Sequence, residues 1–98
     1  MTSGSVPRDD RNRDRAPVLL AARLVIDHLD IPVSIRNLST HGMMGESALG
    51  PEVGQIGAIR RGNRQVFGRI VWVRGNRFGF AFESPVNVEL MSQPVESD

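Results

Sequence analysis

The sequence contains no cysteine and no lysine, and it has only two histidines, His28 and His41. Without cysteine the chain has neither a disulfide framework nor a thiolate zinc site, and two histidines are too few to suggest a metal centre. No window approaches the ~18 consecutive apolar residues of a membrane-spanning helix, and the first residues lack the apolar stretch of a secretory signal. These absences favour a cytoplasmic globular protein with no metal, no cofactor and no membrane span.

All 12 basic residues are arginine, and 11 acidic residues leave a net charge of only +1. Because this overall charge is small, binding to nucleic acid is not expected, although local basic patches remain compatible with it. The exclusive use of arginine has two explanations. One is a need for planar, forked donors that bind phosphate or guanine. The other is a GC-rich coding sequence, which replaces lysine with arginine.

Alternation of apolar and polar residues predicts β-strands along most of the chain. In the first strand, apolar side chains recur at every second position from Val18 to Ile26. Two copies of the tetrapeptide Arg-Gly-Asn-Arg lie between apolar runs, at 61–64 and 74–77. Each predicts a tight hairpin turn, since glycine and, less readily, asparagine tolerate a positive φ. The expected strands span residues 18–28, 31–36, 55–61, 65–74 and 77–83.

Three further features complete the expected fold. Asp30 and Pro32 separate the first two strands, and the alternation fails at Asn37–Leu38, which predicts a strand end or a β-bulge. The turn-rich segment from residue 39 to 57 is expected to be a long loop, and residues 86–91 a short helix. Five or six short strands in a chain of this length predict an all-β, antiparallel β-barrel.

Aromatic residues are assigned to the core of this barrel. Phe78, Phe80 and Phe82 share one face of the last strand, opposite smaller or polar residues. Trp72 lies in a strand that is apolar on both faces, so it is also expected to be buried.

The sequence contains no arrangement typical of an enzyme. Ser39 and His41 are close in sequence, but no activated-serine motif surrounds them. No glycine-rich phosphate loop leads into a helix, and no pair of carboxylates lies in an apolar context. The predicted activity is therefore binding without catalysis.

Two motifs indicate what is bound. Residues 11–15 (RNRDR) fit R-x-x-x-R, and residues 37–42 (NLSTHG) fit [DN]-x-S-x-x-G. The first motif alone carries little weight, because Arg60 and Arg64 have the same spacing. In this order, and followed by the strands GRIVWV and GFAFE, the two motifs resemble the PilZ family over about residues 11–91.

The resemblance implies a six-stranded antiparallel PilZ-type β-barrel that binds the bacterial second messenger cyclic di-GMP. Carried onto this chain, Arg11 and Arg15 contact guanine and phosphate, while Asn37, Ser39 and Gly42 contact the ligand from the other side. Guanidinium forks suit guanine O6 and N7 and phosphate oxygens, and a glycine permits close backbone approach. The alternative is that the loop motif is only a turn, with Asn37 and Ser39 capping backbone donors and Gly42 at a positive φ.

The expected organisation is a flexible arginine-rich arm (1–16), the barrel with its short C-terminal helix (17–92) and a polar tail (93–98). We expect the arm to become ordered on the ligand and to signal to an effector protein. Asp9, Asp10 and Asp14 depart from the usual pattern and leave the ligand stoichiometry open. Two other functions remain open. One is a PilZ-like protein-interaction domain that binds no nucleotide, and the other is a small nucleic-acid-binding barrel that uses Phe67 or Trp72 for stacking.

Overall fold

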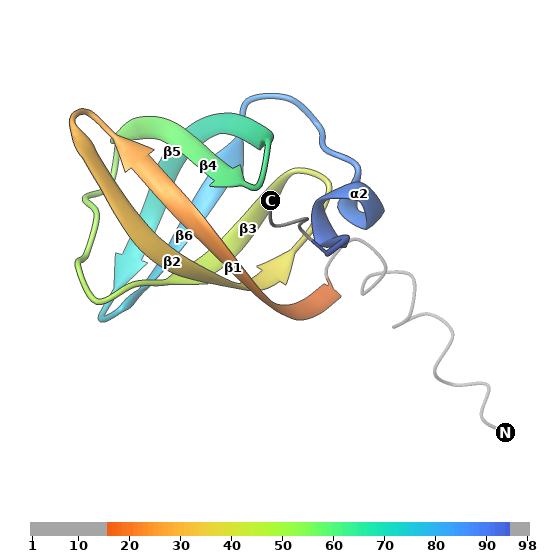
Figure 1. Ribbon diagram of the computed structural model, residues 1–98. Coiled ribbons are helices and arrows are strands. Elements are labelled where there is room, and N and C mark those ends of the chain that lie inside the picture. The colour runs from red at the N-terminus through yellow and green to blue at the C-terminus, as the bar shows by residue number, and fades with distance from the viewer. Residues whose placement is uncertain (1–15, 95–98) are drawn as a thin grey trace, which may run out of the picture.

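The computed structural model describes residues 16–94 and shows a closed barrel of six antiparallel strands with one short helix (Figure 1). The strands follow one another around the barrel in the order β1-β2-β3-β6-β5-β4, and β4 pairs with β1 to close it. The predicted fold class is confirmed. The elements are β1 (Ala16–Ile26), β2 (Leu29–Leu38), β3 (Gly42–Glu46), β4 (Ile56–Arg61), β5 (Arg64–Arg74), β6 (Arg77–Phe82) and α2 (Val88–Ser92).

The two Arg-Gly-Asn-Arg hairpin turns form as predicted. Gly62 has φ 65° and Gly75 has φ 61°, whereas neither asparagine has a positive φ. The predicted break at Asp30 and Pro32 is wrong, because the chain reverses earlier: β1 ends at Ile26 and β2 begins at Leu29. Asp27, with φ 54°, makes this turn. Pro32 is tolerated inside β2 since β3 pairs only with Ser34–Leu38 and needs no donor from it.

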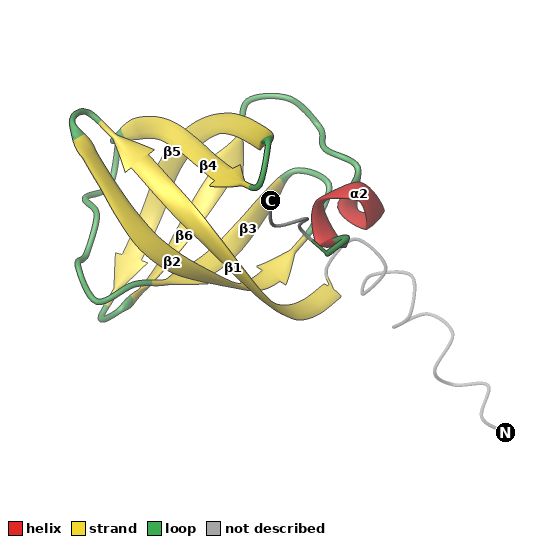
Figure 2. Cartoon of the chain, in the orientation of Figure 1, coloured by secondary structure: helices red, strands yellow, loops and turns green. Residues whose placement is uncertain are grey.

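The predicted long loop from residue 39 to 57 contains the strand that the sequence reading missed, β3. Its glycines resemble turn residues, but Gly45 instead makes room for an aromatic ring: a Cβ there would lie 2.7 Å from Cζ of Phe78. The remaining loop, residues 47–55, is held to the barrel at both ends (Figure 2). Ser47 N donates to Asn76 O at 2.9 Å, and Gly54 N donates to Ile70 O at 2.8 Å.

Two β-bulges change which side chains face outward. The first lies in β2 between Ile35 and Asn37, where the sequence predicted a break, and the second lies in β5 between Ile70 and Trp72. Each bulge adds a residue to one strand, so the side chains beyond it exchange faces. The assignment of Trp72 to the core is therefore wrong: it is 40% exposed, on the outer wall of the barrel.

The core fills the barrel interior with apolar side chains from every strand. Phe78 and Phe80 are buried as predicted, and Phe82 is partly buried and meets Phe80 edge-on, with ring centroids 5.9 Å apart. The largest fully buried side chains are Phe78, Phe80, Leu24, Ile26, Ile35, Leu38, Ile59 and Ile70.

The helix α2 begins two residues later than the predicted range of 86–91 and covers one end of the barrel with the buried Met91. The Asn87 side chain caps it by accepting a hydrogen bond from Leu90 N at 2.9 Å. Arg61 holds the other end of the helix. Its guanidinium donates to the carbonyl oxygens of Met91, Gln93 and Ala21 at 2.9–3.0 Å, and burial lowers its pKa.

Candidate ligand-binding groove

The loop motif lies at one end of a groove on the outer wall of the barrel. Cross-strand neighbours run in one row from Asn37 to Met44, then to Gly79 and Trp72, across β2, β3, β6 and β5. Because the two bulges turn Asn37 and Trp72 outward, the row faces solvent rather than the core. The groove has a volume of about 360 Å³ and is lined by Asn37, Leu38, Ser39, His41, Gly42, Met43, Met44, Val71, Trp72, Gly79, Phe80 and Ala81.

Ser39 and Gly42 form a closed turn at the entrance to β3. Ser39 N donates to Gly42 O at 2.8 Å. The Ser39 hydroxyl donates to the same oxygen at 3.0 Å and accepts from Gly42 N at 3.2 Å. The hydroxyl therefore shapes the loop and keeps one lone pair that can accept a further hydrogen bond.

Gly42 is needed for close packing and not for an unusual backbone conformation. Of the alternative interpretation of the motif as a turn, the capping of a backbone donor by Ser39 is confirmed, whereas the positive φ expected at Gly42 is wrong. A Cβ on Gly42 would lie 2.8 Å from the carbonyl oxygen of Phe80 on the neighbouring strand. A glycine at this position lets β3 lie against β6 at the edge of the groove.

Asn37 presents a carboxamide to the groove from the first bulge. Its side chain is partly buried, and within residues 16–94 it takes part in no hydrogen bond. A carboxamide offers both a donor and an acceptor, which matches the edge of a nucleobase.

Trp72 forms the wall opposite the loop motif. A Cβ on Gly79 would overlap the Trp72 indole, so the glycine allows the ring to lie directly on β6. The exposed side of the indole borders the groove, where it can stack on a planar ligand. Sequence reasoning assigned Trp72 to the core and named it as a stacking residue only for the alternative nucleic-acid-binding function. A tryptophan opposite a glycine in the β5–β6 hairpin register is the signal for its position here.

Two arginines lie near the row of residues next to the groove, although neither lines the groove itself. The next row of outward residues pairs Ser34 with Glu46 and Glu46 with Arg77. Glu46 accepts hydrogen bonds from Arg77 Nε and Arg36 Nη1, both at 2.9 Å. The hydrogen bond from Arg77 is the main cause that lowers the pKa of Glu46; desolvation opposes it, and the hydrogen bond from Arg36 lowers the pKa further. The two arginines outweigh this one carboxylate, so this group of residues at the border of the groove has a net positive charge.

The structure brings the predicted residues Asn37, Ser39 and Gly42 together in this groove. The predicted residues Arg11 and Arg15 lie outside the described residues. The first described residue, Ala16, pairs with Leu38 inside the loop motif. The chain that carries the first motif therefore enters the barrel beside the second motif.

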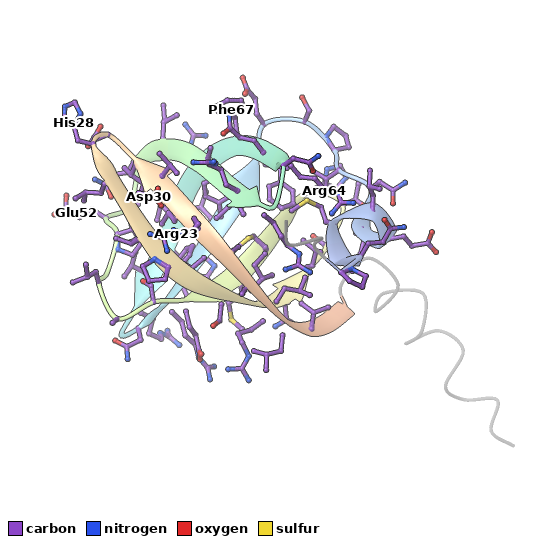
Figure 3. The ribbon with its side chains drawn as sticks, in the orientation of Figure 1. Arg23, His28, Asp30, Glu52, Arg64 and Phe67 are labelled. Atoms are coloured by element: carbon purple, nitrogen blue, oxygen red, sulfur yellow. The ribbon has the colours of Figure 1, made fainter. Side chains whose placement is uncertain are left out.

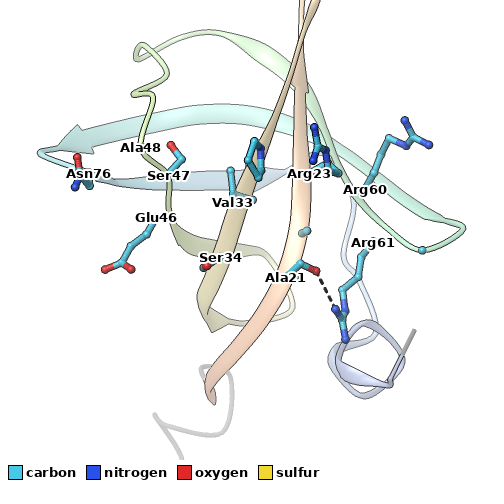
Figure 4. Close-up of a pocket in the computed structure, with 13 residues that line it drawn as sticks. Ala21, Arg23, Val33, Ser34, Glu46, Ser47, Ala48, Arg60, Arg61 and Asn76 are labelled. Carbon is cyan, nitrogen blue, oxygen red and sulfur yellow. Dashed lines mark hydrogen bonds between the residues drawn. The ribbon is translucent and has the colours of Figure 1, made fainter. Parts of the chain in front are cut away.

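A larger hollow of about 820 Å³ lies on another part of the wall, and the predicted residues Asn37, Ser39 and Gly42 do not line it (Figure 4). It extends over the β1–β2 hairpin to the β4–β5 turn, and its floor is made of small side chains such as Ala21 and Ser34. Arg23, on its border, pairs with Asp30 at 2.8 Å (Figure 3). Its charge is thus partly neutralised by this contact within the hairpin.

Two other kinds of site are absent from the part of the chain that the structure describes. No group of three or more histidine or acidic side chains is placed to hold a metal ion there. None of the described helices has the length and apolar character needed to cross a membrane.

Comparison with known proteins agrees with the motifs. The family model of the PilZ domain matches residues 9–96, which include both motifs and all six strands. No curated protein gives a significant sequence match.

Proposed function

Because the chain belongs to the PilZ family, whose members are generally receptors for cyclic di-GMP, we propose that the groove binds this nucleotide. The protein would then be a non-catalytic, cytoplasmic receptor. The observation that carries the proposal is the meeting of three features: the loop motif, the exposed Trp72 and the start of β1 lie around one groove with a basic border.

The chemistry of the groove suits the parts of the ligand. Cyclic di-GMP has two guanines and two phosphates, which require planar stacking surfaces, paired donors and acceptors, and positive charge. Trp72 supplies a stacking surface, and base–aromatic stacking is worth about 1–3 kcal/mol per base. Asn37 supplies a donor and an acceptor for a guanine edge, and Arg36 and Arg77 supply positive charge near the phosphates.

In this proposal Arg11 and Arg15 close the site from the N-terminal side. Guanidinium groups bind guanine O6 and N7 or phosphate oxygens through two parallel hydrogen bonds. Fixing each backbone residue of the arm costs about 1–2 kcal/mol, so part of the binding energy is spent on ordering it. We therefore expect a dissociation constant in the micromolar range. We also expect that an effector protein detects the ordering of the arm.

Isothermal titration calorimetry with cyclic di-GMP tests the proposal. We expect Arg11→Ala and Arg15→Ala each to weaken binding at least about tenfold, the loss that corresponds to 1.4 kcal/mol. Arg60→Ala is the matched control, because Arg60 and Arg64 repeat the same spacing across the β4–β5 turn and neither lines the groove. Wild-type protein that shows no heat of binding would instead support a protein-interaction domain that binds no nucleotide.

A further inference from the structure

A second exposed surface lies on β4 and β5 and adjoins the groove at Val71. We call it the β5 patch and define it by Ile56, Phe67, Arg69 and Val71. Ile56 is 69% exposed, Phe67 52% and Val71 45%, and Phe67 projects outward from the wall (Figure 3). Single exposed apolar residues are common on protein surfaces, but a contiguous group of them indicates an interaction site.

The strand register makes the β5 patch contiguous. Phe67, Arg69 and Val71 alternate along β5 with the buried Gly68 and Ile70, so they share the outer face. Ile56 lies directly across from Arg69 on β4. Three exposed apolar residues thus flank Arg69 on the outer face.

Two hollows lie beside the β5 patch, where small residues such as Gly68 and Ala81 leave space. A hollow of about 400 Å³ is bordered by Ile56, Arg69, Ala81 and Glu83, and a second of about 260 Å³ is bordered by Phe67, Glu83 and residues 84–86. The two hollows share Glu83, and the first shares Ala81 with the candidate ligand groove. The groove and the two hollows are therefore neighbours on the outer wall.

The charge of the β5 patch identifies the partner chemistry. Arg69 is exposed, and it forms no salt bridge among residues 16–94. Arginine and large aromatic residues are the side chains most enriched at the centres of protein interfaces. A carboxylate of the partner would form the strongest contact with Arg69, and an apolar side chain of the partner would bury Ile56 and Phe67.

We propose that the β5 patch docks an acidic, apolar segment of a partner protein. A second copy of this chain fits less well, because a two-fold contact centred on the β5 patch would bring Arg69 against its own counterpart. A nucleic acid also fits less well, because Arg69 is the one basic side chain among the described residues that border the two hollows, whereas a phosphate backbone is held by several. The stretch from Phe67 to Val71 is about 13 Å long at ~3.3 Å per residue, enough for an extended segment of about five residues.

Selection from a random dodecapeptide library displayed on phage tests this inference, with the full-length protein as bait. We expect the selected peptides to be rich in aspartate or glutamate together with leucine, phenylalanine or tryptophan. Fluorescence anisotropy of a selected, labelled peptide then compares the wild type with Phe67→Ser and Arg69→Glu. Each variant should bind at least about tenfold more weakly, as expected for residues at an interface centre.

Leu29→Ser is the matched control, because Leu29 is 54% exposed, close to the value for Phe67, but lies at the β1–β2 turn. It should bind the peptide as the wild type does. Replacing the acidic residues of the peptide with lysine should abolish binding to the wild type and restore it to Arg69→Glu. Circular dichroism checks that each variant folds, which is expected because Phe67 and Arg69 are exposed.

Peptides without acidic residues, or equal affinity for Phe67→Ser and the wild type, would overturn the inference. Binding of a labelled oligouridylate that depends on Phe67 would assign the β5 patch to nucleic acid and overturn it as well. The inference is separate from the proposed nucleotide site. Phe67 and Arg69 do not line the groove, so both variants should retain wild-type heat with cyclic di-GMP.

Discussion

Replacing Arg61 with methionine is expected to release the C-terminal helix from the barrel. The guanidinium donates three hydrogen bonds to backbone carbonyls, of which two belong to the end of α2 and one to β1. The residue is only 8% exposed. Methionine keeps the apolar stem of the side chain but leaves these carbonyls without their donors.

The size of the effect follows from this contact set. A hydrogen bond to a charged group contributes about 1.5–3 kcal/mol to stability. The sum over three such bonds is an upper limit for the loss, because it applies only if water reaches none of the three carbonyls in the variant. The end of α2 lies at the surface, where Gln93 is exposed, so water replaces part of the loss. We therefore expect the free energy of unfolding to fall by about 2–3 kcal/mol. For a domain of this size the melting temperature falls by about 10–20 °C.

Thermal unfolding followed by far-ultraviolet circular dichroism measures this change. Arg60→Met is the control, because Arg60 is the exposed neighbour on the same strand and should change stability by less than about 0.5 kcal/mol. Equal melting temperatures for the two variants would refute the role assigned to Arg61.

Three further predictions concern the groove. Glu46→Gln should reduce the loss of stability that occurs as the pH is lowered. Because the pKa of Glu46 is lowered in the folded protein, its carboxylate stabilises the fold at pH values above the ordinary pKa of 4.5. This stabilisation is lost as the pH falls through the lowered pKa. Melting temperatures at neutral pH and at about pH 3 measure this effect. An equal fall in melting temperature for the variant and the wild type would contradict the prediction. Gly42→Ala should destabilise the barrel by about 1–3 kcal/mol in urea unfolding, since its Cβ would press on Phe80 O at 2.8 Å; no change would show that β3 can shift freely. Gly79→Val should push the Trp72 indole away from β6 and shift its fluorescence to the red, and an unchanged spectrum would refute their contact.

The strands were predictable wherever one face is buried along the whole element. Apolar alternation located β1 and the hairpins of the C-terminal half, and the failed alternation at Asn37 located a bulge. β3 was missed because its glycines serve packing against an aromatic ring, which a sequence pattern does not distinguish from turn formation. The turn at Asp27 was missed because a positive φ at an aspartate has no strong sequence signal.

The site was only partly predictable. Asn37, Ser39 and Gly42 came from a contiguous motif, and the structure gathers them in one groove. Trp72 was misplaced in the core because the β5 bulge reverses the faces after Ile70, and the bulge is visible only in the register with β6. The role of Arg61 depends on carbonyls from distant parts of the chain, so no local pattern indicates it.

The most direct test of the central claim is a titration of ¹⁵N-labelled protein with cyclic di-GMP, followed in ¹H–¹⁵N correlation spectra. The account predicts that the largest shifts occur at the backbone amides of Asn37, Gly42 and Gly79 and at the indole N–H of Trp72. Spectra that do not change, or shifts confined to the hollow around Arg23 on the β1–β2 hairpin, would contradict it.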